Sequence, residues 1–398
     1  MYPAFLPDGQ TFIFLARNTE VENSAIFARS LASGDERRIM TADSQALYAN
    51  GYLFFVRQGF LMAHKFDPER LVLGDGPWSV ADQIQIDPTS GRIPVSISAT
   101  GALAAIQGVA PEASLTWFDR NGREVGTTWV PGDYRQVNLS PDGSQIVTER
   151  FDPKTGVPEI WLVEPERNVS TKFTIGTSDR DPIWSGDSRR IVFSSRRGPS
   201  ADIYVKTVGG SGQEELVLDL EPQVTASDWS RDGAYLLYVL GQGASDIFAL
   251  PMNGEGKPFP IVTSRFTEDS ARFSFDGRWI AYNGNESGRM EVYAVPFPKA
   301  DVKVQISNEG GSQPRWRGDG RELFYLSSDG KIMAVDLPGN GPLKPSAPKV
   351  LFQTPLSVNT NIDQYAVTAD GSRFLLPMRT DDSGPAPISI ILNWRPPQ

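Results

Sequence analysis

Catalysis by a nucleophile and a base usually relies on histidine or cysteine, and this chain has little of either. His64 is its one histidine, and it contains no cysteine. A hydrolase nucleophile often stands on a sharp G-x-S-x-G turn, and no such segment occurs in the sequence. His64, flanked by Ala63 and Lys65 in a short extended stretch, is predicted to lie on a strand surface. We therefore expect no catalytic residue.

A transition-metal site is also not expected, because zinc and similar metals rely on histidine and cysteine ligands and the chain has one histidine and no cysteine. Calcium prefers oxygen ligands, and the segments Asp179 to Asp181 and Asn283 to Ser287 place such ligands at alternate positions. Neither segment is a full EF-hand loop, and Asp and Asn also form turns. We interpret both as turns and expect no metal and no other cofactor. A bound calcium ion stays the open alternative.

Charge and length exclude further classes of function. The formal net charge is −10, whereas a nucleic-acid or anionic-membrane partner requires a basic surface. No apolar run is long enough to span a membrane, and no phosphate-binding G-x-x-x-x-G-K-[ST] loop occurs. The expected partner is therefore a protein or a small molecule, bound by a monomer. The 48 acidic residues keep a lyase or a glycosidase with paired carboxylates as the alternative.

The strands that would position any functional site are predicted from a β-hairpin sequence that repeats along the chain. Its clearest copy is the turn Ser140-Pro141-Asp142-Gly143, which joins two short extended runs. Proline presets φ, Asp bonds back to its own backbone, and Gly accepts the left-handed conformation that tight hairpins need. Further copies read LPDGQTFIF, SGDSRRIVF, SRDGAYLLY, SFDGRWIAY, RGDGRELFY and TADGSRFLL.

The spacing of these turns predicts the fold. The turn glycine or its equivalent recurs at Gly9, Gly51, Gly101, Gly143, Ser188, Gly233, Gly277, Gly320 and Gly371, at intervals of 42 to 51 residues. Such a period with four strands per unit is typical of propeller blades. We expect an all-β fold, one domain over 1–398, with nine blades or, if two weak repeats merge, eight. The approximate repeats are 1–44, 45–90, 91–132, 133–178, 179–222, 223–266, 267–310, 311–356 and 357–398.

An aromatic residue occupies one fixed slot, four or five residues before the turn glycine. It is Phe5, Trp184, Trp229, Phe273 or Trp316, with Leu139 in one copy. A large side chain there would pack between adjacent sheets, where truncation to Ala costs about 3–5 kcal/mol. We expect the three tryptophans to be nearly buried.

The repeats also carry a family likeness. RDPIWSGDSRRIVFSS and SQPRWRGDGRELFYLS resemble the WD-repeat-like propeller of the Tol-system protein TolB. FLPDGQTFIFL, YLFFVRQGFLMAHKFDP, NESGRMEVYAVPFP and ISIILNW are still more similar to the propeller that follows the membrane segment of bacterial eukaryotic-like Ser/Thr protein kinases. The resemblance implies an extracytoplasmic sensor or interaction domain of a membrane-anchored parent protein. A TolB-like periplasmic docking domain is the other implied function.

Recognition is expected on one of the two faces of the propeller. The S-x-D-G turns are uniform, which suits turn formation better than recognition, whereas variable loops on the opposite face suit binding. The predicted binding residues are Tyr134, Arg135, Arg150, Arg180, Asp181, Arg196, Arg197, Glu268, Asn285, Glu286, Arg289 and Gln313.

Overall fold

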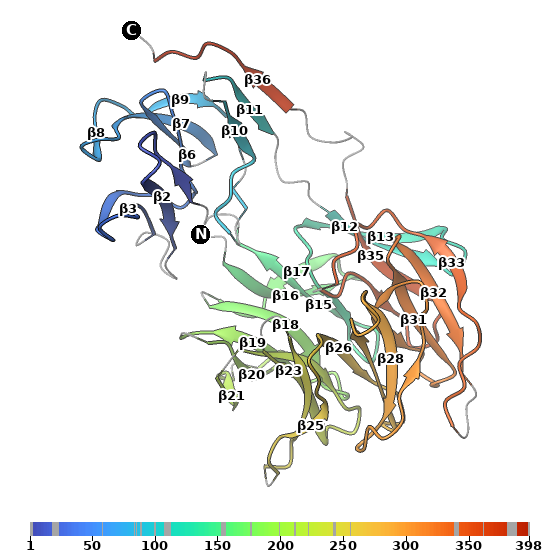
Figure 1. Ribbon diagram of the computed structural model, residues 1–398. Helices are drawn as coiled ribbons and strands as arrows, with labels where there is room; N and C mark the ends of the chain where they lie inside the picture. Colours follow the sequence, from blue (N-terminus) through green and yellow to red (C-terminus); the bar gives the residue numbers. More distant parts are fainter. Residues whose placement is uncertain are drawn as a thin grey trace. The chain divides into compact units, whose positions relative to one another are not determined.

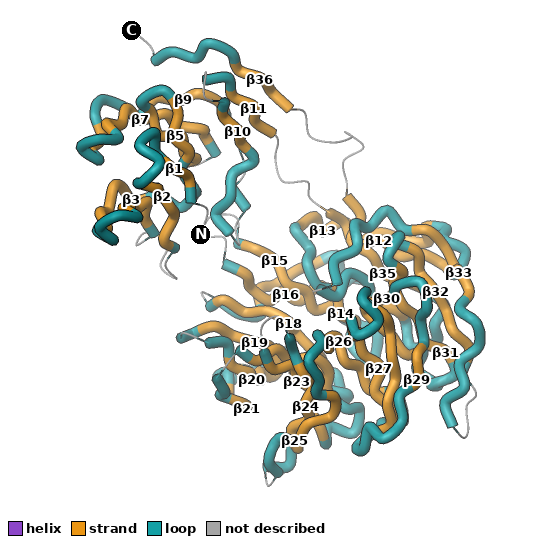
Figure 2. The backbone as a smooth tube through the Cα atoms, viewed as in Figure 1, coloured by secondary structure: helices purple, strands orange, loops and turns teal. Residues whose placement is uncertain are grey.

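The computed structural model describes residues 3–396 except 18–23, 58, 83, 85, 88–89, 99–100, 107–112, 153–156, 176, 199, 211, 222, 242–243, 255, 338–341, 361 and 380–387. All secondary-structure elements within these residues are β-strands, and none is a helix (Figure 2). The strands form nine sheets, and the chain divides into two compact units. The ring unit comprises Glu112–Arg150 and Val157–Thr380, and the three-sheet unit comprises Met1–Pro111, Phe151–Gly156 and Asp381–Gln398.

The ring unit contains six four-stranded antiparallel sheets (Figure 1). Five of them are each built from four consecutive strands. They are β14 (Val137–Leu139), β15 (Ile146–Phe151), β16 (Pro158–Glu164), β17 (Val169–Lys172); β18 (Ser178–Trp184), β19 (Arg190–Arg196), β20 (Asp202–Thr207), β21 (Glu215–Leu218); β22 (Val224–Trp229), β23 (Tyr235–Leu240), β24 (Asp246–Pro251), β25 (Phe259–Val262); β26 (Glu268–Phe273), β27 (Trp279–Gly284), β28 (Glu291–Pro296), β29 (Val304–Gln305); and β30 (Gly311–Trp316), β31 (Glu322–Ser327), β32 (Lys331–Asp336), β33 (Lys349–Gln353).

The sixth sheet closes the ring by joining distant parts of the chain. Its strand order is β34 (Ala366–Val367), β35 (Arg373–Arg379), β12 (Ala113–Asp119), β13 (Glu124–Gly132). β12 pairs with β35 over seven residues, from Ala113 opposite Arg379 to Asp119 opposite Arg373. The closing sheet contacts both neighbours, because the Val137 amide donates to the Asp363 carbonyl and the Phe324 and Phe374 rings pack edge to face. The ring unit is therefore a closed six-bladed propeller.

The three-sheet unit uses the same hairpins without closing a ring. Its sheets are β1 (Ala4–Phe5), β2 (Thr11–Ala16), β3 (Ala25–Ser30), β4 (Glu36–Thr41); β5 (Leu47–Ala49), β6 (Tyr52–Arg57), β7 (Phe60–Asp67), β8 (Val72–Leu73), with β9 (Trp78–Ala81) paired to β7; and β10 (Val95–Ile97), β11 (Leu103–Ile106), β36 (Ile388–Ile391). Apolar clusters pack each sheet on the next, and Trp394 meets the rings of Tyr52 and Phe54.

Strand pairing corrects two of the expected repeats. The sequence predicted that residues 91–132 form one repeat and 357–398 another. In the structure β10 and β11 pair with β36 from the last repeat, whereas β12 and β13 pair with β35. The repeat 91–132 therefore begins two different sheets, and strands of the last repeat complete both of them. The structure thus places six sheets in the ring unit and three in the second unit, where the sequence predicted one nine-bladed domain.

The aromatic slot is buried in the ring and exposed at the start of the chain. Trp184 and Trp229 are 5% and 4% exposed, as predicted, and Phe273 is 8% exposed. The prediction for the third tryptophan was wrong, because Trp316 is only half-buried. The expectation for Phe5 was wrong, because its side chain is 58% exposed. β1 is a two-residue edge strand, so no second sheet covers Phe5.

Candidate binding site

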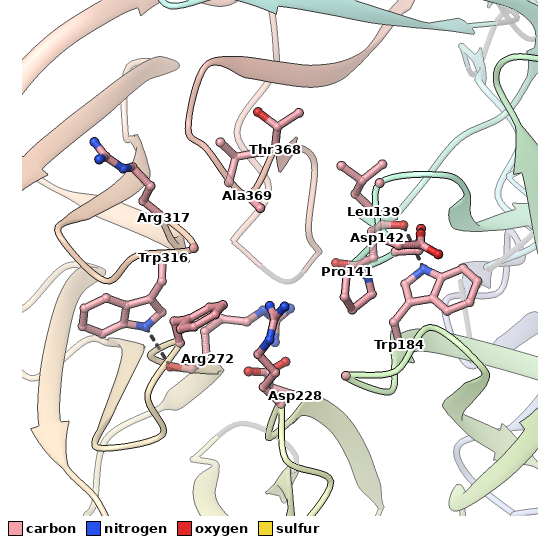
Figure 3. Close-up of a pocket in the computed structure, with 18 of the residues that line it drawn as sticks. Leu139, Pro141, Asp142, Trp184, Asp228, Arg272, Trp316, Arg317, Thr368 and Ala369 are labelled. Atoms are coloured by element: carbon pink, nitrogen blue, oxygen red, sulfur yellow. Dashed lines mark hydrogen bonds between the residues drawn. The ribbon is translucent and has the colours of Figure 1, made fainter.

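A cavity of about 580 Å³ opens at the end of the ring that carries the S-x-D-G turns. All six sheets of the ring contribute residues to this turn-side cavity, and Figure 3 shows them converging on one space. Trp184 and Pro141 come from one side, Trp316 and Arg317 from the other, and Asp228 with Arg272 lies at the centre (Figure 3). A volume of this size lies within the range of small-ligand sites.

The rim of the cavity is fixed by turn chemistry. In the first turn the Ser140 hydroxyl donates to Asp142 Oδ1 at 2.6 Å and accepts from the Gln145 amide at 2.9 Å. The same serine–aspartate bond recurs in the next three sheets, at 2.6 to 2.7 Å. These bonds hold the pKa of Asp142 below its usual value, chiefly through Ser140. Each turn aspartate is thus an anion committed to its own turn.

Neighbouring turns also touch each other around the rim. A Cβ added to Gly186 would lie 2.1 Å from the carbonyl oxygen of Arg231 in the next sheet. Gly318 donates its amide to the Ala369 carbonyl at 2.7 Å, and a Cβ there would lie 2.7 Å from the same oxygen. Glycine is required at both places because two backbones approach so closely. Backbone contacts therefore join neighbouring turns at these two places around the mouth of the cavity.

The floor of the cavity is a buried charge network. Asp363 accepts ion pairs from Arg272 and Arg315, the latter at 2.8 Å, and all three residues are below 9% exposed. Arg272 also donates to the Ser227 and Ala271 carbonyls. Asp228 Oδ2 accepts from the Phe273 amide at 2.7 Å. Both arginines are therefore committed to partners within the protein.

The network separates the pKa values of its two aspartates. Burial alone would raise the pKa of Asp363, but the guanidiniums of Arg272 and Arg315 hold it below its usual value. Burial raises the pKa of Asp228, and the opposing field of Arg272 does not cancel that effect. Asp363 is thus the anion that the two arginines share, whereas Asp228 is the carboxyl whose charge is disfavoured.

Beyond the floor, the ring centre carries more disfavoured carboxyls. Burial raises the pKa of Asp269 to about 6, and burial with the nearby Asp181 raises the pKa of Glu149 to about 8. Asp181, Ser270 and Gln313 have positive φ values of 54°, 51° and 58°, at points where the register of the inner strand shifts. Such bulges redirect side chains locally. The inner strands therefore present polar groups toward the centre of the ring.

None of the twelve binding residues predicted from the sequence is among the described residues that line the turn-side cavity. Six of them gather around two neighbouring sheets: Arg150 lies over the rings of Tyr134 and Trp161, Arg135 pairs with Asp133, Arg180 lies 3.9 Å from Glu149, Gln136 donates to Asp181, and Arg196 is 3.5 Å from Gln223.

The other six are also engaged within the ring. Arg197 pairs with Glu214, Glu268 accepts from Ser264, Asn285 accepts from the Thr267 amide, Glu286 pairs with Lys303, Arg289 pairs with Glu291, and Gln313 bonds Asn359 and Gln364. These contacts account for the residues structurally. Their predicted role in binding stays a prediction.

Sequence reasoning missed the central residues Asp228, Arg272 and Arg315. A signal for them existed, since each directly precedes the aromatic slot of its repeat, at Trp229, Phe273 and Trp316. A charged residue at that place lies on the sheet face opposite to the aromatic side chain, because successive side chains point to opposite faces. His64 lies in β7 of the three-sheet unit, with Nε2 3.2 Å from the Gly74 carbonyl oxygen. Among the described residues no group of three metal-ligating side chains gathers.

Comparison with known proteins supports the fold. No protein-family model matches the chain. An uncharacterized protein of Agrobacterium fabrum is 24% identical over 229 residues, which is 56% of this chain and 76% of that protein. The uncharacterized peptidase YuxL of Bacillus subtilis is 32% identical over 116 residues, 27% of this chain and 17% of that protein. The Tol-Pal system protein TolB of Francisella tularensis is 23% identical over 161 residues, 39% of this chain and 37% of that protein.

The solved structure of a TolB protein, described as putative, from Agrobacterium tumefaciens superposes with a TM-score of 0.53 and 19% identity. It covers 68% of this chain and 99% of its own. The class of protein is therefore an all-β propeller. Within that class the fold is TolB-like, whereas the matched segments span only 17% of YuxL and 37% of the Francisella TolB. No helix among the described residues is long and apolar enough to cross a membrane.

Proposed function

We propose that this protein is a non-catalytic binding domain and that its ligand enters the turn-side cavity of the ring. The observation that carries the proposal is the cavity itself, about 580 Å³ and lined by all six sheets. Its rim is joined by backbone contacts between turns, and its buried arginines pair within the ring, so the site is formed before any ligand arrives. The TolB-like fold fits a binding role of this kind, which we extend to this chain as part of the proposal.

The cellular setting is the finer part of the proposal. The domain acts outside the cytoplasm, where it presents the cavity to a protein or a small-molecule ligand as part of a membrane-anchored parent. Two settings meet this description: the sensor domain of a receptor-type Ser/Thr kinase, and a TolB-like periplasmic docking domain. The kinase likeness rests on sequence motifs such as ISIILNW, and the TolB likeness on motifs and fold together.

An enzyme is the second candidate, favoured by one observation. The cavity combines Asp228, whose pKa is raised by burial, with Asp142, whose pKa is lowered by turn hydrogen bonds. Carboxyls with pKa values pushed apart are the pattern of a general acid and its charged partner. The hydrogen bond from Phe273 and the nearby Arg272 argue for a structural role of Asp228 instead. Turnover of a polysaccharide that Asp228→Asn abolishes would favour the enzyme.

The proposal is tested by soaking crystals of the protein with a library of small fragments. We expect bound fragments to concentrate in the turn-side cavity, and Ala369→Trp, which fills the mouth, to remove them. Charge reversal of Arg135, Arg180 and Arg289 together serves as the matched control on the rival surface. Fragments that collect around those three arginines, and leave the cavity empty, would contradict the proposal and restore the face predicted from the sequence.

A further inference from the structure

Three arginines on the turn side have their guanidinium groups over aromatic rings. The guanidinium carbon of Arg231 is 4.2 Å from the centre of the Phe275 ring, that of Arg190 is 4.8 Å from Trp229, and that of Arg373 is 4.9 Å from Trp117. Among the described residues, no carboxylate forms an ion pair with any of the three. This distinguishes them from Arg278 and Arg317 on the same side, which pair with Asp276 and Asp319 at 2.6 Å.

Stacking leaves the hydrogen-bonding edge of a guanidinium available. The planar group covers the ring with one face, while its N–H donors still point outward in a fork that matches a carboxylate. Arg231 and Arg373 both line the turn-side cavity. They belong to sheets three places apart in a ring of six, so they lie on opposite sides of the mouth. The pKa of Asp370 is lowered chiefly by the Thr368 hydroxyl and also by the charge of Arg373, so Arg373 already interacts with a carboxylate of the protein. Arg231 is the stronger anchor.

The ring that supports Arg231 is itself unusual. Phe275 is 44% exposed, although large apolar side chains in this unit are mostly buried. It forms the shared wall between the turn-side cavity and a second cavity of about 170 Å³. Tyr235, Phe273 and Phe297 line the second cavity, and the Tyr235 and Phe297 rings meet edge to face with centres 4.9 Å apart. Aromatic walls of this kind accept an apolar side chain.

The carboxylates near this wall are already engaged. Asp276 pairs with Arg278, and Asp232 accepts from the Ser230 hydroxyl at 2.6 Å and from the Ala234 amide at 3.0 Å. The floor arginine Arg272 pairs with Asp363. Arg231 lines both cavities and, unlike Arg272 and Arg317, forms no ion pair with a carboxylate among the described residues, on a chain whose net charge is −10. An acidic ligand would find its attraction concentrated there.

We propose that the turn-side cavity binds an extended peptide that carries a carboxylate next to an aromatic or branched apolar side chain. The carboxylate pairs with Arg231, the apolar side chain enters the second cavity behind Phe275, and the peptide continues across the mouth toward Arg373. A chain with successive side chains fits two adjoining cavities, whereas a compact small molecule would occupy one. This inference rests on the proposed function and specifies its ligand.

The test uses the full chain and a positional-scanning hexapeptide library, with binding read by fluorescence anisotropy of labelled peptides. We expect Asp or Glu to be selected beside Phe, Leu or Ile. Replacing the acid by its amide, or changing Arg231→Gln, should each weaken binding about tenfold, as expected for a charged hydrogen bond of this kind. Raising the salt concentration should weaken binding as well.

Arg278→Gln is the matched control, because Arg278 lies on the same face and does not line the turn-side cavity. It should leave binding unchanged, and Phe275→Ala should remove the preference for an apolar neighbour. Selection of neutral or basic peptides that Ala369→Trp still blocks would overturn the charge inference and leave the proposed cavity standing. Absence of binding by every peptide and every fragment would overturn both.

Discussion

The ring unit and the three-sheet unit are built from the same hairpin, but only the ring unit joins its first and last sheets into a closed structure. In the ring unit β35 and β12 join the two ends, so each sheet packs between two others. In the three-sheet unit the sheet of β10, β11 and β36 has three strands, and Ile388, Ile390 and Leu392 are 60% to 66% exposed. Closure, more than the repeat itself, decides whether a given position in the hairpin is buried.

The two units also differ in what they bury. The described carboxylates that are buried all belong to the ring unit, and among the described residues of the three-sheet unit the buried polar side chains are Ser24, Ser44 and Gln45. A closed ring has a centre that no strand can fill, so polar side chains of six inner strands meet there. A stack of sheets has no such centre, and its core is apolar. The site and the titratable groups follow from the ring.

The largest expected effect compares one repeat position in the two units. Trp229→Ala should lower the free energy of unfolding of the ring by about 3–5 kcal/mol, because it empties a slot between two sheets. Phe5→Ala, at the same repeat position, should change stability by about 0.5 kcal/mol or less, since its ring is exposed. Urea denaturation of both variants measures the difference. Equal losses would mean that closure does not govern burial.

A second prediction concerns the rim of the ring, where the backbones of neighbouring turns come into contact. Gly186→Ala should cost about 1–3 kcal/mol, because its Cβ would meet the Arg231 backbone. Gly9→Ala is the control in the three-sheet unit: it has a φ of 64° and nothing within 4 Å of its Cβ position. The control should cost about 1–2 kcal/mol through backbone strain alone. Only Gly186→Ala should also weaken ligand binding, measured with the peptide assay. Intact ligand binding by Gly186→Ala would show that the backbone contact between Gly186 and Arg231 does not shape the site.

The third expected effect is a pH dependence that belongs to the ring. The raised pKa of Glu149, about 8, means that the folded state holds a proton which the unfolded state releases near pH 4.5. Stability contributed by the protonated group is therefore present at low pH and lost as pH rises through 8. Glu149→Gln, which stays neutral, should gain stability relative to the parent between pH 5 and pH 9. Melting temperatures of both proteins across that range provide the measurement, and parallel curves would refute the assignment.

Much of the fold could be predicted because turns are local. The S-x-D-G motif specifies a hairpin through bonds within five residues, and it predicted the turns at Asp142, Asp232 and Asp276. Strand exchange could not be predicted in this way. The strands β35 and β36 are rich in apolar residues, as most of the other strands are. Either strand could therefore pair with any strand of the same pattern, and the sequence does not indicate which sheet each one joins.

The candidate site was harder to predict for a different reason. The uniform sequence of the turns suits turn formation and by itself predicts no binding role. Six such turns arranged in a ring nevertheless enclose a cavity that no single turn indicates. The bulges at Asp181, Ser270 and Gln313 use residues other than glycine at positive φ, and such positions carry no clear sequence signal. Single residues that depend on the ring, such as Arg231, gain their role only once neighbouring sheets are in place.

The exchange of end strands also sets an order of events during synthesis. Leu103 in β11 pairs with Ile391 in β36, and the whole ring unit lies between them in the sequence. A ribosome therefore makes the first two sheets of the three-sheet unit, then every blade of the propeller, and only afterwards the strand that completes the third sheet. Folding from the N-terminus onward, the usual route for multidomain chains, is reversed here for one sheet. The sheet begun by β10 and β11, before the ring is made, is finished only after it.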